Sequence, residues 1–282
     1  MPELPEVEVL ARHLRPLLAG QRIRRVDVCR AKVVRPQCGA AFAAVLRGAR
    51  FERVARRGKY LVFSLRGRSG ARLRLLGHIG MTGRMHLQAA TEPLPRHAAV
   101  VLRLDHGRFV YEDTRYFGRL TLDGAALARL GPEPLGPGFT ARYFEQALRR
   151  SGQAIKPRLL DQALVAGVGN IYASEALCRA RISPRRRARQ LTAAECGRLR
   201  RAVRAVLWEA IAFGSTVPLR FSSRGVADGL FYYGRAAGTP DSYTERLRVY
   251  ARAGQPCGRC GTRIRRLVQA ARSTYYCPQC QR

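Results

Sequence analysis

Gly131-Pro132-Glu133-Pro134-Leu135-Gly136-Pro137-Gly138 interrupts this sequence near its middle. Proline lacks the backbone N–H that helices and central strands use, and glycine loses the most conformational entropy when it is ordered. A stretch with three prolines and three glycines therefore cannot continue either kind of element. It predicts a linker between two parts of the chain, and the hydrophobic pattern differs on its two sides.

Short strands are predicted before this linker. Between residues 20 and 122, alternating or apolar runs are separated by turn residues, which is typical of β-strands. The runs cover residues 22–29, 59–65, 72–76, 100–104 and 108–111. Asp105-His106-Gly107 separates the last two runs and predicts a hairpin. The first part of the chain is therefore predicted to be β-rich.

Helices are predicted after the linker, because apolar residues there recur with a helical period. The helical segments cover residues 142–150, 157–164, 171–179 and 192–213. A chain of 282 residues with 46% hydrophobic residues has enough apolar material for two cores. The sequence thus predicts an α+β protein with a β-rich domain followed by a mainly α domain.

Four cysteines near the end of the chain have the spacing of a metal site. Cys257 and Cys260, and then Cys277 and Cys280, form two Cys-x2-Cys pairs with sixteen residues between the pairs. This spacing favours one tetrahedral Zn²⁺ over two disulfides, because a chain without secretory features keeps its thiols reduced. Residues 263–268 and 273–276 read as two strands of a hairpin held by the metal. Four cysteine ligands leave no open position, so the zinc is predicted to be structural.

The charge of the chain predicts a polyanionic partner. Lys and Arg number 52 against 19 Asp and Glu, which gives a formal net charge of +33 and a pI near 11.4. Nucleic acid is favoured over a membrane surface, since the sequence has no long apolar span, signal peptide or lipidation motif. The chain is therefore expected in the cytoplasm. Only three of its cations are lysines, namely Lys32, Lys59 and Lys156.

The start of the chain carries a candidate nucleophile. Removal of Met1 leaves Pro2 with a terminal secondary amine, which titrates near neutral pH and adds readily to an aldehyde or acetal carbon. The iminium so formed keeps its positive charge, and Glu3 beside it is a candidate acid or base. The alternative is that Pro2 only begins a helix, because apolar residues follow at helical spacing from Val7 onward.

A glycine-rich turn lies between two of the predicted helices. Ala166-Gly167-Val168-Gly169-Asn170 combines a tight turn with the start of a helix, where unpaired N–H groups suit a phosphate oxygen. An ordinary turn with Asn170 as the helix N-cap fits the same residues.

The ordered set of these segments resembles the bacterial formamidopyrimidine-DNA glycosylases of the formamidopyrimidine-DNA glycosylase and endonuclease VIII family. The resemblance spans nearly the whole chain and includes the four-cysteine finger. The other matching segments are Pro2-Glu3-Leu4-Pro5-Glu6-Val7-Glu8, Gly58-Lys59-Tyr60, His78-Ile79-Gly80-Met81-Thr82-Gly83, Arg115-Tyr116-Phe117-Gly118, Gly131-Pro132-Glu133-Pro134-Leu135, Ile155-Lys156-Pro157 and Gly167-Val168-Gly169-Asn170-Ile171-Tyr172-Ala173-Ser174-Glu175.

The resemblance implies a fold and an activity. It implies a catalytic β-sandwich over residues 1–135, a helix-two-turn-helix domain over 136–245 and a zinc finger over 246–282. The implied activity is that of a monomeric, nucleoid-associated glycosylase and abasic-site lyase acting on oxidised purines in duplex DNA by β,δ-elimination. One structural Zn²⁺ is implied, with no catalytic metal or organic cofactor.

The resemblance also assigns residues. Pro2 attacks the deoxyribose C1′, Glu3 transfers protons, and Lys59 faces the sugar and its phosphates. Asn170 and Arg272 grip phosphates around the flipped nucleotide, and Glu175 positions the terminal amine. The remaining implied DNA contacts are His97, Lys156 and a wedge of Met81, Arg115 and Phe117.

Several of these assignments have alternatives. His97 is equally compatible with a solvated loop, Lys156 with a helix start, and the Met81 and Phe117 side chains with core packing. Two features depart from the family pattern: the segment 222–252 is longer, and Tyr116 replaces a basic residue. Two other functions stay open, an endonuclease VIII-type enzyme for oxidised pyrimidines and a non-catalytic zinc-ribbon DNA-binding protein.

Overall fold

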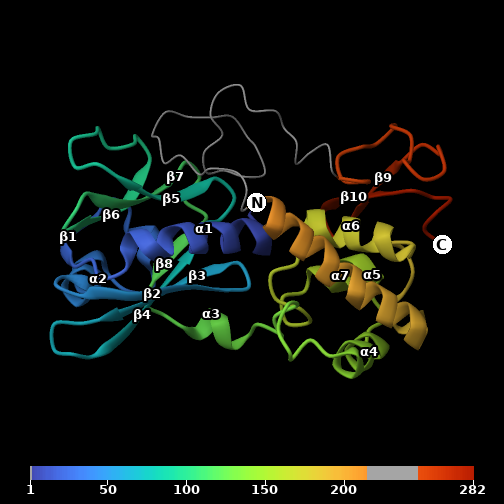
Figure 1. Cartoon of the computed structure of the whole chain (residues 1–282), viewed down its shortest axis with the longest axis horizontal. Helices are drawn as coiled ribbons and strands as arrows, with labels where there is room; N and C mark the ends of the chain where they lie inside the picture. The colour runs from blue at the N-terminus through green and yellow to red at the C-terminus, as the bar shows by residue number, and fades with distance from the viewer. Residues whose placement is uncertain (1, 215–246) are drawn as a thin grey trace. The chain divides into compact units, whose positions relative to one another are not determined.

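The computed structural model describes residues 2–214 and 247–282, which form two compact units (Figure 1). The first unit comprises residues 2–128, and the second comprises residues 129–213 together with 247–282. The predicted division at residue 135 falls close to the boundary between the units. The structure groups the helices and the cysteine-rich hairpin in one unit. The division at residue 245, which the resemblance implies, falls outside the described residues and stays a prediction.

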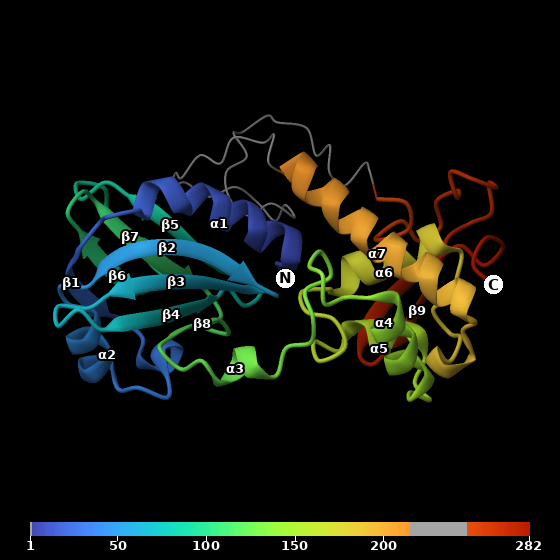
Figure 2. The same ribbon diagram turned by 60° about the horizontal axis from the view of Figure 1, so that its bottom comes forward.

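The first unit contains two four-stranded antiparallel sheets, which appear as two layers in Figure 2. One sheet has the order β1 (Ile23–Val28), β6 (Ala98–Leu104), β7 (Arg108–Asp113), β5 (Gly83–Gln88). The other has the order β2 (Arg50–Arg57), β3 (Tyr60–Arg66), β4 (Arg72–His78), β8 (Arg119–Thr121). The expected β-rich domain is confirmed, and the structure adds β2, β5 and β8 to the predicted strands.

The inner faces of the two sheets form the core of this unit. The Phe63 ring on β3 lies 5.6 Å from the Phe109 ring on β7 and 5.8 Å from the Phe51 ring on β2, in edge-to-face arrangements. A Cβ at Gly77 would come within 2.8 Å of the Met85 sulfur, so the two sheets pack closely where β4 meets β5. Alternate residues of β3 are buried here, and the others point outward.

Helix α1 (Leu4–Leu18) lies alongside β2 and buries one face against the core (Figure 2). Val7, Leu10 and Leu14 recur on that face and are fully buried, so the predicted helix is confirmed. The remaining helical segments of the described first unit are η1 (Ala31–Val34), α2 (Gly39–Leu46) and α3 (Ala125–Ala128).

The second unit is helical and ends in a hairpin (Figure 1). Its helices are α4 (Ala141–Arg149), α5 (Ile155–Leu160), α6 (Asn170–Ala180), η2 (Ala188–Gln190) and α7 (Ala193–Gly214). Strands β9 (Arg265–Gln269) and β10 (Arg272–Tyr276) pair antiparallel, and α6 packs against β10. The predicted hairpin and helices are confirmed, except that the helix predicted over residues 157–164 is observed over Ile155–Leu160. The predicted linker packs onto α7, because Arg204 Nη1 donates to the Pro134 carbonyl at 2.8 Å.

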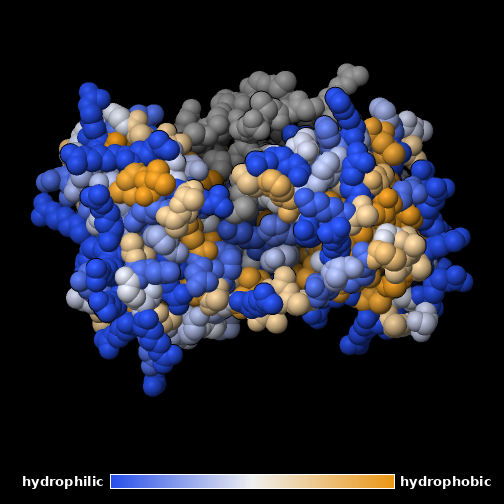
Figure 3. Space-filling view, turned by 180° about the vertical axis from the view of Figure 1, so that it is seen from behind, coloured by the Kyte–Doolittle hydropathy of each residue, from blue (hydrophilic) through white to orange (hydrophobic). Residues whose placement is uncertain are grey.

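The surface matches the composition. Hydrophilic side chains cover most of the face seen in Figure 3, and hydrophobic ones lie in separate groups. Within residues 2–214 and 247–282, the helices are too short or too polar to cross a bilayer.

Candidate active site

The first turn of α1 fixes a carboxylate beside Pro2. Glu3 is the N-cap residue and is 2% exposed. Its side chain accepts from the backbone N–H of Glu6, and its own N–H donates to Glu6 Oε2 at 2.8 Å, which completes a capping box. The Glu3 carboxylate therefore has a defined position one residue after the candidate nucleophile.

A buried arginine links this helix to the turn that carries Lys59. Arg56 Nε lies 2.9 Å from Glu8 Oε2, and Arg56 Nη1 donates to the Gly58 carbonyl at 3.1 Å. Burial alone would raise the pKa of Glu8, but hydrogen bonds from Arg12 and Arg56 hold it below its ordinary value. Lys59 follows Gly58 and is only 8% exposed. The β2–β3 turn that carries it lies at the end of the sheet near the start of α1 (Figure 2).

His78 continues this end of the sheet towards the next turn. It pairs with Tyr60 across the β3–β4 ladder, and the two rings lie 4.9 Å apart. Its Nδ1 accepts from the Gly80 N–H at 3.3 Å, which requires a neutral ring. Burial, and then the charge of Lys59, lowers the pKa of His78 to about 4. The histidine therefore stays uncharged at neutral pH and orients the turn before Met81.

We expect acid to destabilise this unit through the partly buried His78 and the buried His86. Burial also lowers the pKa of His86 to about 4. The unfolded chain binds these protons near pH 6.5 and the folded chain near pH 4, so stability is full above pH 6.5 and falls as the pH drops towards 4. The expected loss at pH 5 is about 2 kcal/mol per histidine. Urea unfolding at pH 7 and pH 5 measures it, and His78→Asn/His86→Asn must reduce the difference.

Met81, Arg115 and Phe117 form one group on two neighbouring turns. The Arg115 guanidinium carbon lies 4.5 Å from the centre of the Phe117 ring, and Arg115 Nη1 lies 3.8 Å from the Met81 sulfur. Phe117 is 49% exposed and Met81 is partly exposed. The alternative of core packing is therefore excluded for Phe117. The three side chains lie together and are accessible, which is compatible with a wedge that enters a base stack, and this role stays a prediction.

Asp113, which the sequence analysis did not single out, ties these two turns together. Its carboxylate is fully buried. Oδ1 accepts from the Thr82 hydroxyl at 2.6 Å and from the Arg115 N–H at 3.1 Å, while Oδ2 accepts from the Gly118 N–H at 2.9 Å and the Tyr111 hydroxyl at 3.2 Å. A buried carboxylate that accepts from four donors fixes both turns. In the sequence, the one feature that could have identified Asp113 is its position two residues before Arg115.

Tyr116 adds ring contacts beside the wedge. Its φ of +51° is left-handed, which is uncommon for an aromatic residue. The Arg30 guanidinium carbon lies 5.3 Å from the centre of the Tyr116 ring, and the His97 ring lies 6.5 Å from it. In place of the basic residue expected from the family pattern, the chain thus has a stacking group. His97 is partly exposed next to it.

Lys156 is the second residue of α5, which agrees with the alternative of a helix-start residue, and its role as a phosphate contact stays a prediction. Its side chain is fully buried, and Nζ donates to Asn170 Oδ1 at 2.6 Å, to Thr274 Oγ1 at 2.7 Å and to the Ser273 carbonyl at 3.0 Å. Three donated bonds account for the three ammonium protons. Lys156 therefore connects α5 and α6 to the hairpin and orients Asn170.

Asn170 and Arg272 flank this buried lysine. Asn170 is the first residue of α6, whose N-cap is Gly169, and its Nδ2 donates to the Ser273 carbonyl at 3.0 Å. Arg272 is exposed at the start of β10, directly after Ala270 and Ala271 with φ values of +47° and +57°. Two alanines in the left-handed region make a strained tip, which is typical of a functional turn. The predicted role of Asn170 and Arg272 as phosphate ligands stays a prediction.

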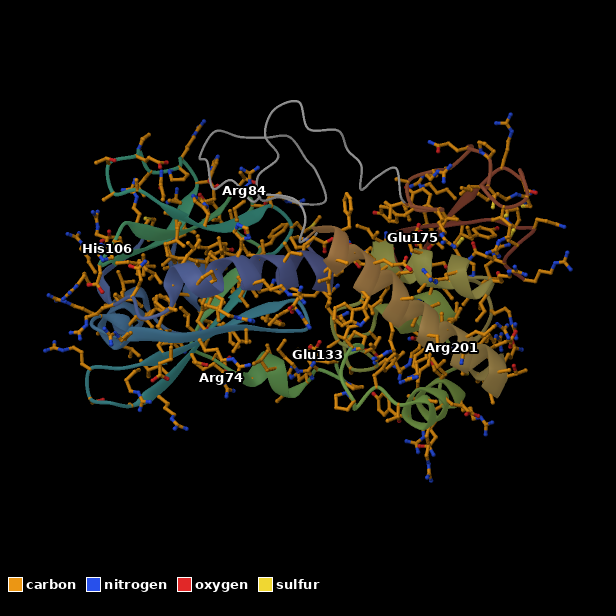
Figure 4. All side chains as sticks on the ribbon, in the orientation of Figure 1. Arg74, Arg84, His106, Glu133, Glu175 and Arg201 are labelled. Carbon is orange, nitrogen blue, oxygen red and sulfur yellow. The ribbon has the colours of Figure 1, made fainter. Side chains whose placement is uncertain are left out.

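Glu175 lies on α6 within the second unit (Figure 4). It is 5% exposed, and its two oxygens accept the backbone N–H groups of Arg248, Val249 and Tyr250 at 2.9, 3.0 and 2.8 Å. Glu175 thus anchors the backbone that leads to the finger. Its predicted role towards the terminal amine stays a prediction, and residues 222–246 of the longer segment lie outside the described residues.

The four predicted zinc ligands lie together at the base of the hairpin. The sulfurs of Cys257, Cys260, Cys277 and Cys280 are all within 4.8 Å of one another, and neighbouring pairs are 3.4, 3.5 and 4.0 Å apart. A tetrahedral site with Zn–S bonds of about 2.3 Å needs sulfurs roughly 3.8 Å apart. The set fits one structural zinc, and all four positions of the metal are filled by protein.

Removal of zinc is expected to loosen the hairpin selectively. Chelation removes the metal ion that connects the four cysteines, so the pairing of β9 and β10 is destabilised. The sheets of the first unit contain no zinc ligand and should stay folded. Amide exchange at residues 265–276 should become fast, protection at residues 60–66 should persist, and duplex DNA binding should weaken. Cys29→Ser changes an exposed cysteine outside the cluster and serves as the control. Unchanged hairpin protection after complete zinc removal contradicts the prediction.

The predicted site residues thus fall into two groups. The first unit holds Pro2, Glu3, Lys59, Met81, His97, Arg115 and Phe117, and the second holds Lys156, Asn170, Glu175, Arg272 and the four cysteines.

Comparison with known proteins finds similarity to formamidopyrimidine-DNA glycosylases along the chain. Family models match at residues 1–120 (formamidopyrimidine-DNA glycosylase N-terminal domain), 130–220 (its H2TH domain) and 254–282 (a zinc finger found in FPG and IleRS). The formamidopyrimidine-DNA glycosylase of Symbiobacterium thermophilum is 43% identical over 100% of this chain and 89% of its own.

Solved structures agree with these matches. The MutM (Fpg) protein of Thermus thermophilus superposes with a TM-score of 0.82 at 41% identity and covers 99% of this chain and 98% of its own. The Lactococcus lactis enzyme, non-covalently bound to DNA containing an abasic site, superposes with a TM-score of 0.84 at 31% identity and 99% coverage of both chains.

Proposed function

The chain belongs to the formamidopyrimidine-DNA glycosylase family, and from this premise we propose that it is a monomeric glycosylase and abasic-site lyase. Its substrates are oxidised purines, 8-oxoguanine and formamidopyrimidines, in duplex DNA. The observation that carries the proposal is the capping box, because it holds the Glu3 carboxylate one residue from Pro2. The enzyme acts in the cytoplasm on nucleoid DNA.

Base release begins with attack of the Pro2 amine on C1′ of a flipped nucleotide. A bond forms between the proline nitrogen and C1′, and the bond from C1′ to the base breaks. The base leaves with the electron pair of that bond and takes up a proton, which balances the proton that the proline nitrogen releases. Glu3 donates a proton to the ring oxygen, the sugar ring opens, and the nitrogen lone pair completes an iminium. The proline nitrogen has lost its only proton by this stage, so the adduct stays cationic.

Strand cleavage follows from this charge. The iminium acidifies C2′–H, and loss of that proton expels the 3′ phosphate; a second proton loss at C4′ expels the 5′ phosphate. Lys59 assists at the sugar and its phosphates, and Asn170 and Arg272 hold the flanking phosphates. Met81, Arg115 and Phe117 fill the space left by the flipped nucleotide, with Arg115 reading the orphaned base, expected to be cytosine.

Borohydride trapping on abasic duplex DNA tests this function. Reduction of the iminium links protein and DNA covalently, and peptide mapping must locate the link at residue 2. A catalytically silent zinc-ribbon DNA-binding protein forms no such product. An endonuclease VIII-type enzyme forms it too, but releases thymine glycol faster than paired 8-oxoguanine. Intact mass of the protein shows whether Met1 is removed, since a retained methionine blocks the amine.

Asp113→Asn is expected to impair excision from duplex DNA by about 10- to 100-fold. In asparagine an NH2 group replaces one carboxylate oxygen, so it faces two of the four groups that donate to Asp113 and cannot accept from them. The turns that carry Met81, Arg115 and Phe117 therefore lose their fixed geometry. Cleavage of an abasic site in single-stranded DNA needs no wedge and should change less than about threefold. The ratio of these two rates is the measurement. Equal losses on both substrates indicate general destabilisation and contradict the wedge role.

A further inference from the structure

The outward face of the second sheet carries a cluster of arginines far from the candidate active site. Arg50 on β2 lies directly opposite Arg66 on β3, and Arg66 lies opposite Arg72 on β4. In the adjacent row Ser64 stands between Arg53 and Arg74. All five arginines are exposed, while neighbouring Phe63 and Leu65 point into the core. We call these five residues the arginine face.

This arrangement destabilises the folded sheet, because like charges on directly opposed residues repel one another across a strand spacing of about 4.8 Å. Elsewhere the chain relieves such a pair: Arg25 and Arg103 face each other on β1 and β6, and Asp27 accepts from both at 2.7 and 2.9 Å. On the arginine face, the ion pairs found among the described residues involve Arg66 alone, with Glu52 at 2.7 Å. Within residues 2–214 and 247–282, the other four guanidinium groups have no ion pair and are available to an external anion.

The arginine face is separate from the candidate active site. Lys59 and His78 lie at one end of β3 and β4, and Arg66 and Arg72 lie at the other end. Six residue steps along a strand correspond to about 20 Å. Arg74 extends from β4 in the first unit, as labelled in Figure 4. Arg50, Arg66 and Arg72 are therefore remote from Lys59, whereas Arg53 and Arg74, which lie opposite Ser64, are four residue steps, or about 13 Å, from that end.

We propose that the arginine face is a second contact surface for duplex DNA, which binds the phosphate backbone of a segment other than the one being repaired. This inference rests on the proposed function. Guanidinium groups bind phosphate in a bidentate manner, and neighbouring strands space them along the regularly charged backbone of a duplex. Two DNA contacts on one molecule permit direct transfer between duplexes without a free intermediate, which shortens the search for rare lesions.

A competitor-dependent dissociation experiment tests the proposal with the full-length, zinc-loaded protein. The protein is bound to a labelled undamaged duplex and mixed with increasing concentrations of an unlabelled one. With a second contact surface, the dissociation rate of the label rises as the competitor concentration rises, because the incoming duplex binds before the first leaves. The variant Arg50→Gln/Arg72→Gln/Arg74→Gln should make this rate independent of competitor and lower the salt slope of the second binding event by about 3.

A matched variant with the same change in net charge is Arg142→Gln/Arg150→Gln/Arg201→Gln, which alters exposed arginines of the second unit (Arg201 is labelled in Figure 4). It should retain competitor-dependent dissociation. A competitor-independent rate in the unaltered protein overturns the proposal, as does equal behaviour of the two triple variants. Single-turnover excision by the arginine-face variant should stay within about twofold of the unaltered protein. Excision and trapping test the proposed function separately, since the transfer experiment uses undamaged DNA alone.

Discussion

Pro2→Gly is expected to lower the rate of base release by about 10³-fold or more, while the protein still binds duplex DNA with its usual salt dependence. Glycine presents a primary amine, so its imine can lose its proton and the positive charge that drives elimination. Glycine also gives the backbone before Glu3 more conformational freedom, so the amine is held less well in the orientation that attacks C1′. Single-turnover release of 8-oxoguanine from a paired duplex measures the effect.

Pro5→Gly is the matched control for this variant. Pro5 lies in the first turn of α1, so its replacement removes a proline from the same helix start and leaves the terminal amine intact. Its excision rate should fall less than about tenfold. Binding that is lost together with activity in Pro2→Gly points to misfolding. Equal loss of excision in the two variants assigns Pro2 to helix initiation and removes it from the chemistry.

Glu3→Gln is expected to lower base release by roughly 10²- to 10⁴-fold, the range for loss of a general acid or base. Glutamine keeps an oxygen that accepts the Glu6 N–H, so the capping box and the start of α1 persist. The variant therefore removes the transferable proton with little change in structure. The rate is measured under single-turnover conditions across pH, and the limb of the profile that belongs to Glu3 should disappear.

Glu6→Gln provides the comparison, because Glu6 is the other carboxylate of the same capping box and accepts the Glu3 N–H. A helix cap contributes about 1 kcal/mol to stability, so either glutamine variant should unfold at a similar denaturant concentration. Glu6→Gln should excise within about threefold of the unaltered protein. If both variants lose activity to the same extent, the carboxylate of Glu3 acts only through the helix start.

Local patterns predicted much of this fold. The proline- and glycine-rich stretch from Gly131 ends the β-rich part near the observed boundary between units, and the helices around Val7 and after residue 140 lie where their apolar spacing placed them. β2 was missed for a physical reason: a bulge between Phe51 and Arg53 breaks the period of two, and the exposed residues of the strand, Arg50, Glu52 and Arg53, are all charged. The sequence therefore looks polar where the strand is half-buried.

The sequence by itself determined the zinc ligands and the carboxylate beside Pro2, because cysteine spacing and the capping box act over a few residues of chain. Only the tertiary structure decided that Asp113 joins two turns, that Lys156 is buried under the hairpin, and that arginines of three strands meet on one face. Those features depend on strand register and on pairing between residues separated by up to 118 positions. Such pairings are set by how the apolar faces pack, and they cannot be predicted from patterns that extend over a few residues.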